Sequence, residues 1–271
     1  DGTQLTMLRA LELNENDFMI LAEECNRCGV GFMSTPFDMQ SIDFLSSVNM
    51  DYWKIPSGEI TNLPYLRKIA SKGGRIILST GMSTIDEVKD AVTALSLGGV
   101  DKKDIYLLHC TTQYPTPHEA VNLRAMDSLK ELGCAGVGYS DHTKGILVPI
   151  AAVARGAEII EKHFTLDHDM PGPDHKASLS TDELKEMVSS IREVEKILGS
   201  EIKEVTATEQ PNITVARKSI VASRPIRKGE SLTDHNITTK RPGSGISPML
   251  WDSVIGSHAI RDFLTDEPIE I

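Results

Sequence analysis

The stretch that decides the fold covers residues 136–165 and has the sequence GVGYSDHTKGILVPIAAVARGAEIIEKHFT. Residues 136–139 and 158–161 are short runs of strand length, and the apolar segment 146–155 between them is long enough for a helix. A strand, a helix and a strand in this order predict a βαβ unit with neighbouring parallel strands. Each predicted strand runs directly into polar residues that include a histidine.

The same unit is repeated toward the N-terminus. Further strands are predicted at 30–34, 52–55, 75–78 and 105–108, and further helices at 17–29, 39–48, 63–72, 83–97, 125–132 and 181–198. The helix at 83–97 opens on the cap signal Ser83-Thr84-Ile85-Asp86. Polar residues follow most of the strands, whereas an open doubly wound sheet gathers its functional residues at one switch point. We therefore predict a (β/α)8 TIM barrel.

The predicted units number six, which is two fewer than the eight of a closed barrel. The chain begins with Asp1-Gly2-Thr3-Gln4, which does not resemble a natural initiation. We expect the first two strands of the barrel to precede Asp1.

Three segments are predicted along the chain. Residues 1–198 form the incomplete barrel, and residues 199–215, which have no apolar period, form a linker. Residues 216–271 contain short β runs divided by turn signals such as Lys228-Gly229-Glu230, and predict a small, mostly β module. A module of this size has a thin core, so we expect it to pack against a neighbour.

Composition narrows the class of protein. The formal net charge of −11 argues against a nucleic-acid-binding surface, which needs a basic field. No run of about 18 apolar residues is present, so no membrane-spanning helix is predicted. The four cysteines form no disulfide framework, which fits a reducing cytoplasm, and Cys25 and Cys28 are interpreted as ordinary thiols on a helix.

His142 and His163 form the sharpest pair of candidate functional residues. They follow two adjacent predicted strands, and neighbouring strands lie about 4.8 Å apart. Two imidazoles with no nearby cysteine suit Mn, Fe, Co or Zn with open positions for water and substrate. The alternative is that both are structural histidines at loop junctions.

Other polar residues at the strand ends could bind a substrate. Lys54 could bind a phosphate or carboxylate, Glu59 could act as a general base, and a stiff loop of two prolines and a glycine would hold Asp174. Ser57 lies at the same strand end as Lys54 and Glu59, and the hydroxyl side chains at other strand ends that suit phosphate oxygens are Thr35, Thr112 and Ser140. Arg241 lies on a similar rigid turn in the small module. The alternative for each is a solvated surface residue.

Seven motifs at the strand ends resemble those of the N-acetylneuraminate synthases and their legionaminate and pseudaminate relatives. They occur in the family's order at 32–37 (FMSTPF), 54–59 (KIPSGE), 78–82 (LSTGM), 109–117 (HCTTQYPTP), 139–143 (YSDHT), 161–165 (EKHFT) and 171–174 (PGPD). The small module, with KRPGSG at 240–245, resembles the antifreeze-like (SAF) domain that ends these enzymes. The resemblance covers essentially the whole chain.

This resemblance implies a metal-dependent condensation of phosphoenolpyruvate with an N-acylated mannose-type sugar and water, which gives a nonulosonic acid and phosphate. His142 and His163 match the metal ligands, most simply of Mn2+, with Mg2+ or Co2+ as alternatives, and the metal would polarise the sugar aldehyde. The matches to phosphoenolpyruvate-binding residues are Thr35, Lys54, Ser57 and Ser140, with Phe37 and Thr112 also expected to contact substrate. The matches around the sugar are Glu59, Tyr114 and Asp174, with Glu59 as the proton-transfer group. Arg241 matches an arginine that reaches the partner's active site, which implies a domain-swapped homodimer.

Two features depart from the family pattern. Thr112 stands where some members have asparagine, which leaves a polar donor in place. The family's first strands carry a further carboxylate and a lysine, which are not in this sequence, so we do not expect the chain to be active by itself.

Two other functions stay open. A phosphoenolpyruvate-condensing barrel of the deoxy-octulosonate phosphate type is one, although such enzymes lack the C-terminal module. A non-catalytic carbohydrate-binding or ice-binding protein built on that module is the other, and the polar strand ends argue against it.

Overall fold

The computed structural model describes residues 6, 9 and 11–271. The chain divides into two compact units, Asp1–Gly199 and Ser200–Ile271. No helix in the described part is long and apolar enough to cross a membrane. Each unit has its own apolar core, so each is described separately.

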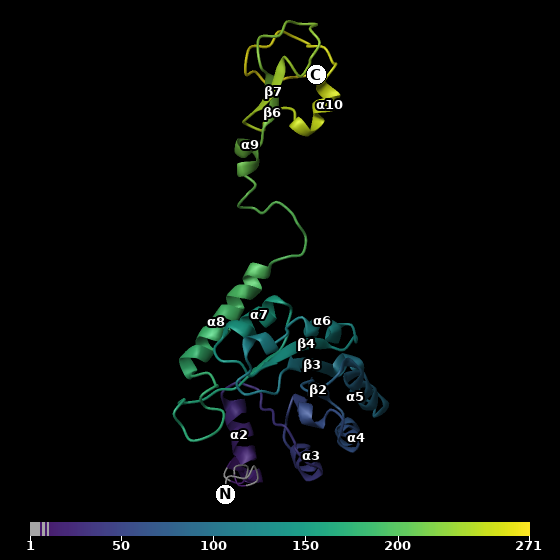
Figure 1. Cartoon of the computed structure of the whole chain (residues 1–271), viewed down its shortest axis with the longest axis vertical. Helices are drawn as coiled ribbons and strands as arrows, with labels where there is room; N and C mark the ends of the chain where they lie inside the picture. The colour runs from purple at the N-terminus through teal and green to yellow at the C-terminus, as the bar shows by residue number, and fades with distance from the viewer. Residues whose placement is uncertain (1–5, 7–8, 10) are drawn as a thin grey trace. The chain divides into compact units, whose positions relative to one another are not determined.

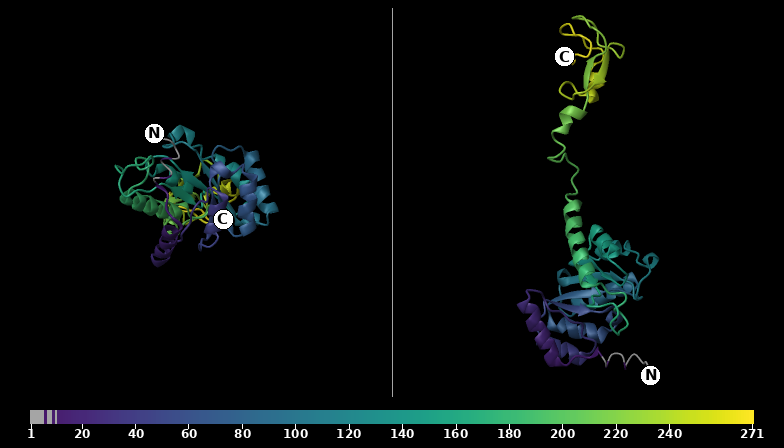
Figure 2. Two further views of the ribbon diagram at one scale, coloured as in Figure 1. Left: turned by 90° about the horizontal axis from the view of Figure 1, so that it is seen from below. Right: turned by 90° about the vertical axis from the view of Figure 1, so that its left-hand side faces the viewer.

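A curled parallel sheet forms the centre of the first unit. Its strands run in the order β1 (Tyr52–Ile55), β2 (Arg75–Ser79), β3 (Ile105–Cys110), β4 (Gly136–Asp141) and β5 (Ile160–Lys162). Every neighbouring pair is parallel. Figures 1 and 2 show helices along one side of this sheet, which leaves the other face inside the curl. These five strands form part of a β/α barrel, which confirms the predicted fold class.

Most helices of this unit begin and end close to the predicted residues. They are α2 (Glu15–Arg27), α3 (Met39–Leu45), α4 (Leu63–Lys72), α5 (Ile85–Leu97), α6 (Ala125–Lys130), α7 (Leu147–Ala154) and α8 (Thr181–Leu198). The start of α5 differs from the predicted cap. Thr84 is the N-cap and Glu87 completes the capping box, because the reciprocal acceptor must lie three residues after the cap.

The predicted strand at 30–34 is wrong. This segment contains no strand, and β1 pairs only with β2 among the described residues. Val30 and Met33 are 58% and 41% exposed, so little burial would hold the segment in a ladder. The amide of Val30 instead donates to the carbonyl of Cys25 at 3.0 Å and closes the end of α2.

The last predicted strand is observed with a small shift. It was predicted at 158–161 and appears as β5 at Ile160–Lys162. Its ladder with β4 nevertheless starts earlier, because the amide of Glu158 donates to Val137 O at 2.9 Å and the amide of Tyr139 donates to Ile159 O at 2.8 Å.

The second unit is built on a short antiparallel pair, β6 (Ser219–Ala222) and β7 (Ile237–Lys240). Figure 2 shows this pair from the side, in the yellow-green part of the chain. Its core is formed by Ile220, Ala222, Ile226, Leu232, Ile237, Val254, Ala259, Phe263 and Ile269. The short helix α10 (Trp251–Val254) follows the turn Pro248–Leu250.

The predicted linker at 199–215 contains the start of a short helix, α9 (Asn212–Ala216). Two contacts fasten α9 to the turn after β7. The amide of Gly243 donates to Thr214 O at 2.7 Å, and Arg241 Nε donates to Ala216 O at 2.9 Å. No residue of α9 is buried, so these two hydrogen bonds rather than an apolar face fasten the helix, and the sequence shows no apolar period here.

Candidate active site

The inner face of the curled sheet becomes polar toward the carboxyl ends of its strands. Side chains alternate between the two faces of a strand, so every second residue points inward. The residues between them point outward and pack against the helices. They include Ile55, Leu78, Leu107, Val137 and Tyr139. The residues that point inward include Lys54, Ser79, Cys110, Ser140 and Glu161. The inner face therefore collects a cation, hydroxyl groups and a carboxylate in one place.

The predicted histidine pair lies at the carboxyl ends of β4 and β5. The imidazole centroids of His142 and His163 are 5.4 Å apart, with their planes at 81°. The ring of Tyr114 lies 4.0 Å from that of His142 and 5.6 Å from that of His163. Asp174 Oδ2 is 3.8 Å from His163 Nδ1. The structure thus brings together the two predicted metal ligands and two residues predicted to surround the sugar.

His142 has the tautomer that a metal ligand needs. Burial lowers its pKa most, and the charge of His163 adds to this effect, while the hydrogen bond with Thr111 acts in the opposite direction. The carbonyl oxygen of Thr111 can only accept, so Nδ1 carries a hydrogen and donates to it at 2.7 Å, and the lowered pKa favours the neutral ring. This leaves the lone pair on Nε2, which is how backbone carbonyls orient metal-binding histidines.

His142 and His163 fit a divalent metal as two of its ligands, without a third protein ligand beside them among the described residues. In the described portion of the chain, no group of three or more His, Cys, Asp or Glu side chains is arranged to hold an ion. His142 and His163 supply two nitrogen donors of the right chemistry, and the other positions would fall to water and substrate.

A second cluster surrounds Lys54. Its Nζ donates to Ser79 Oγ at 2.8 Å and lies 3.4 Å from Glu161 Oε2, and the residue is only 6% exposed. The other oxygen, Glu161 Oε1, accepts a hydrogen bond from Ser140 Oγ at 2.6 Å. Because β1 and β5 are at opposite ends of the sheet, the contact between Lys54 and Glu161 crosses its concave face.

Ser57 and Thr112 converge on a glycine after β2. A Cβ placed on Gly81 would lie 2.8 Å from Thr112 Cγ2, 2.9 Å from Cys110 Sγ and 3.0 Å from Ser57 Oγ. Ser57 Oγ is also 3.8 Å from Cys110 Sγ. Only a residue without a side chain lets these three loops approach so closely.

Among the described residues, four predicted site residues make no hydrogen bond, ion pair or ring contact with the clusters around His142, Lys54 and Gly81. Thr35 lines a cavity of about 310 Å3 together with Phe18 and Phe44. Phe37 is 72% exposed, and the carboxylate of Glu59 accepts a hydrogen bond from Asn62 at 2.6 Å. Arg241 belongs to the second unit.

Glu161 is a site residue that the sequence reasoning missed. It lies two residues before His163 in β5, so strand alternation places both on the inner face. This period of two was the signal that could have identified it. The intervening Lys162 points the other way and forms a buried ion pair with Asp141 at 2.6 Å, which is opposite it in the ladder.

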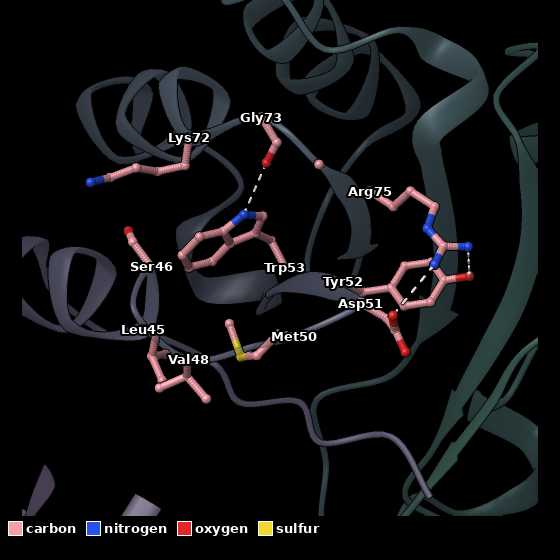
Figure 3. A pocket seen from close by; sticks show the side chains of 11 residues that line it. Leu45, Ser46, Val48, Met50, Asp51, Tyr52, Trp53, Lys72, Gly73 and Arg75 are labelled. Carbon is pink, nitrogen blue, oxygen red and sulfur yellow. Dashed lines mark hydrogen bonds and ion pairs between the residues drawn. The ribbon is translucent and has the colours of Figure 1, made fainter. Parts of the chain in front are cut away.

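A hollow at the other end of the strands does not resemble a reaction site. It has a volume of about 240 Å3 and is lined by the starts of β1 and β2, as Figure 3 shows. Its polar groups are already paired: Trp53 Nε1 donates to Gly73 O at 3.0 Å, and Arg75 contacts Tyr52 and Asp51. The carboxyl ends of the strands, where barrel enzymes hold their chemistry, remain the candidate site.

Comparison with known proteins agrees with this placement. Residues 1–203 match the NeuB family and residues 217–270 match the SAF domain. The N,N'-diacetyllegionaminic acid synthase of Campylobacter jejuni is 49% identical over 99% of this chain and 80% of its own length. The pseudaminic acid synthase of Helicobacter pylori is 34% identical over 92% of this chain and 73% of its own length.

A solved structure shares the fold as well as the sequence pattern. The N-acetylneuraminic acid synthetase of Leptospira borgpetersenii, crystallised with citrate, has a TM-score of 0.73 and 34% identity over 78% of this chain and 74% of its own. The family resemblance and the barrel predicted from the sequence are both confirmed by these matches. The chain belongs to the NeuB family and carries a SAF domain after its barrel.

Proposed function

We propose that this chain is the condensing part of a nonulosonic acid synthase. The reaction joins the methylene carbon of phosphoenolpyruvate to the aldehyde carbon of an N-acylated mannose-type sugar. Water adds at the former enol carbon, and cleavage of the C–O bond releases phosphate. The observation that carries the proposal is the pairing of a histidine site and a buried lysine on the same concave face.

The cluster around Lys54 suits phosphoenolpyruvate. A nearly buried ammonium group is a strong partner for a multiply charged anion, because little water screens it. Ser57 and Thr112 have hydroxyl groups that suit phosphate or carboxylate oxygens, and Ser140, whose hydroxyl donates to Glu161, remains a prediction for this site. Thr35 and Phe37 remain predictions for this end of the site.

The histidine cluster suits the sugar. His142 and His163 would hold a divalent metal, with Mn2+ named first, which when bound supplies a Lewis acid for the aldehyde. Tyr114 forms an aromatic wall beside both rings, and Asp174 can accept hydrogen bonds from sugar hydroxyls. Glu59 remains the predicted proton-transfer group, which requires its carboxylate to leave Asn62.

The relatives favour an acceptor with two N-acetyl groups. Identity is 49% to the diacetyllegionaminic acid synthase and 34% to the pseudaminic acid synthase. Phosphoenolpyruvate brings no nitrogen, so both acetamido groups of a diacetyl product must come from the sugar. We propose a diacetamido sugar as acceptor, to be tested against N-acetylmannosamine and pseudaminic-type sugars in a phosphate-release assay.

Replacement of the histidines tests the metal site. In the full-length protein, His142→Ala and His163→Ala should each abolish turnover and weaken Mn2+ binding measured by calorimetry, while the circular dichroism spectrum is unchanged. The control is His235→Ala, whose side chain is 89% exposed in the second unit. Full activity of either site variant, with metal bound, would refute the assignment, and binding of sugar without turnover in the wild type would favour a carbohydrate-binding protein.

We further propose a domain-swapped homodimer in which Arg241 reaches the partner's active site. The part of the predicted linker between α8 and α9, residues 199–211, would reach roughly 18–22 Å as a flexible chain, and this reach supports a crossing between subunits. Mixing Arg241→Ala and His163→Ala subunits should restore activity in part, because one site of each mixed dimer is intact. No recovery despite proven subunit exchange would leave Arg241 acting within its own chain.

A further inference from the structure

Glu161 occupies a position that the proposed reaction does not explain. Its two carboxylate oxygens have different partners, Ser140 Oγ at 2.6 Å and Lys54 Nζ at 3.4 Å. Both partners are side chains that the proposed function assigns to an anionic substrate. A carboxylate beside an anion site repels the ligand unless it has another purpose.

The buried lysine supplies a reason for the carboxylate. The side chain of Lys54 is 8% exposed, and a buried ammonium without a partner is strongly destabilising. Ser79 provides a neutral acceptor on one side of Nζ, at 2.8 Å, and Glu161 provides the only carboxylate within ion-pair distance in the described residues. The two acceptors together fix where the ammonium points.

The same carboxylate also fixes a hydroxyl group. Ser140 is 2% exposed and lies opposite Glu161 in the ladder between β4 and β5. Its hydrogen bond to Oε1 holds the hydroxyl toward the interior of the curled sheet. One side chain therefore connects a cation on β1 with a hydroxyl on β4, although these strands are not neighbours.

The neighbouring ion pair shows what a purely structural pair looks like in this fold. The side chains of Asp141 and Lys162 are 0% and 3% exposed and face the helices. The side chain of Glu161 is 37% exposed, so it borders open space on the inner face where a ligand can arrive. Its setting is that of a group at a binding site.

We propose that Glu161 is a positioning residue of the anion site, which holds the Lys54 ammonium in place for an anionic substrate. This inference rests on the proposed function for the identity of the anion. Glu161 orders the ammonium group before the ligand binds, and so lowers the entropy that binding would otherwise lose.

Direct binding of phosphoenolpyruvate to the full-length protein, measured by calorimetry without added metal or sugar, tests the proposal. Glu161→Ala should weaken binding about tenfold or more, since it removes the charged contact that orders Lys54. Glu161→Gln keeps an acceptor for Ser140 but no charge for Lys54. Its affinity for phosphoenolpyruvate should therefore lie between those of the wild type and Glu161→Ala. Glu158→Gln, an exposed change in the same segment, is the matched control and should bind like the wild type.

A steady-state measurement separates positioning from a general structural role. The KM for phosphoenolpyruvate should rise by about the same factor as the dissociation constant, while the KM for the sugar changes less than about twofold. Equal binding by wild type and Glu161→Ala would overturn the inference and leave the proposed function standing. Tighter binding by either variant would also overturn it, because the carboxylate would then only repel the anion. Absence of binding by the wild type would overturn both proposals.

Discussion

An alanine at position 81 should damage the site through contact alone. The backbone of Gly81 does not need a positive φ, so an L-residue is allowed there. Its Cβ would nevertheless lie 2.8 Å from Thr112 and 2.9 Å from Cys110, which is closer than Cβ atoms approach in real proteins, and 3.0 Å from Ser57, which is a tight contact. These neighbours are short side chains at the ends of strands, so the backbone must move to relieve the overlap.

The expected magnitude follows from overpacking. Insertion of one methyl group into a tightly packed site costs about 1–3 kcal/mol of unfolding free energy. The same displacement shifts the side chains of Ser57 and Thr112, which are proposed to contact phosphoenolpyruvate, so we expect the KM for this substrate to rise roughly tenfold, equivalent to about 1.4 kcal/mol. The KM for the sugar should change less.

Gly58→Ala is the matched control for Gly81→Ala. It lies beside Ser57 and an added Cβ meets nothing within 4 Å. Unfolding in urea, followed by circular dichroism, should show a change below about 1 kcal/mol for Gly58→Ala and a larger loss for Gly81→Ala. If Gly81→Ala unfolds like the wild type and keeps its KM, the three loops are not packed as the structure describes.

Three further predictions concern single groups. Asp141→Ala should lower the unfolding free energy by about 3–5 kcal/mol, because it leaves the buried ammonium of Lys162 without a counter-charge, and Lys162→Met in that background should recover part of the loss in urea titrations. Burial lowers the pKa of His109, so the folded protein takes up this proton at a lower pH than the unfolded chain, and stability should fall as the pH drops below about 6.5. His109→Gln should make the difference in unfolding free energy between pH 7.5 and 5.5 smaller, and an unchanged difference would contradict the assignment. Lys54→Met should raise the KM for phosphoenolpyruvate much more than that for the sugar, and an equal rise in both would count against its role in the anion site.

Much of the site could be predicted because it depends on the order of neighbouring strands. His142 and His163 follow consecutive strands, and parallel strands joined by a helix lie side by side with their carboxyl ends together. Their meeting at 5.4 Å therefore follows from local sequence patterns. The prediction of a strand at 30–34 was wrong because a run of suitable residues forms a strand only when a neighbouring strand pairs with it, and local sequence does not show whether that partner is present.

Local patterns in the amino-acid sequence determined where most of the strands and helices lie and which residues occupy the strand ends. The tertiary structure alone decided the contacts across the concave face. Lys54 and Glu161 are 107 positions apart and belong to strands with three others between them, so only the curvature of the sheet brings them to 3.4 Å. Curvature results from the packing of all the strands and helices together, and no short stretch of sequence encodes it.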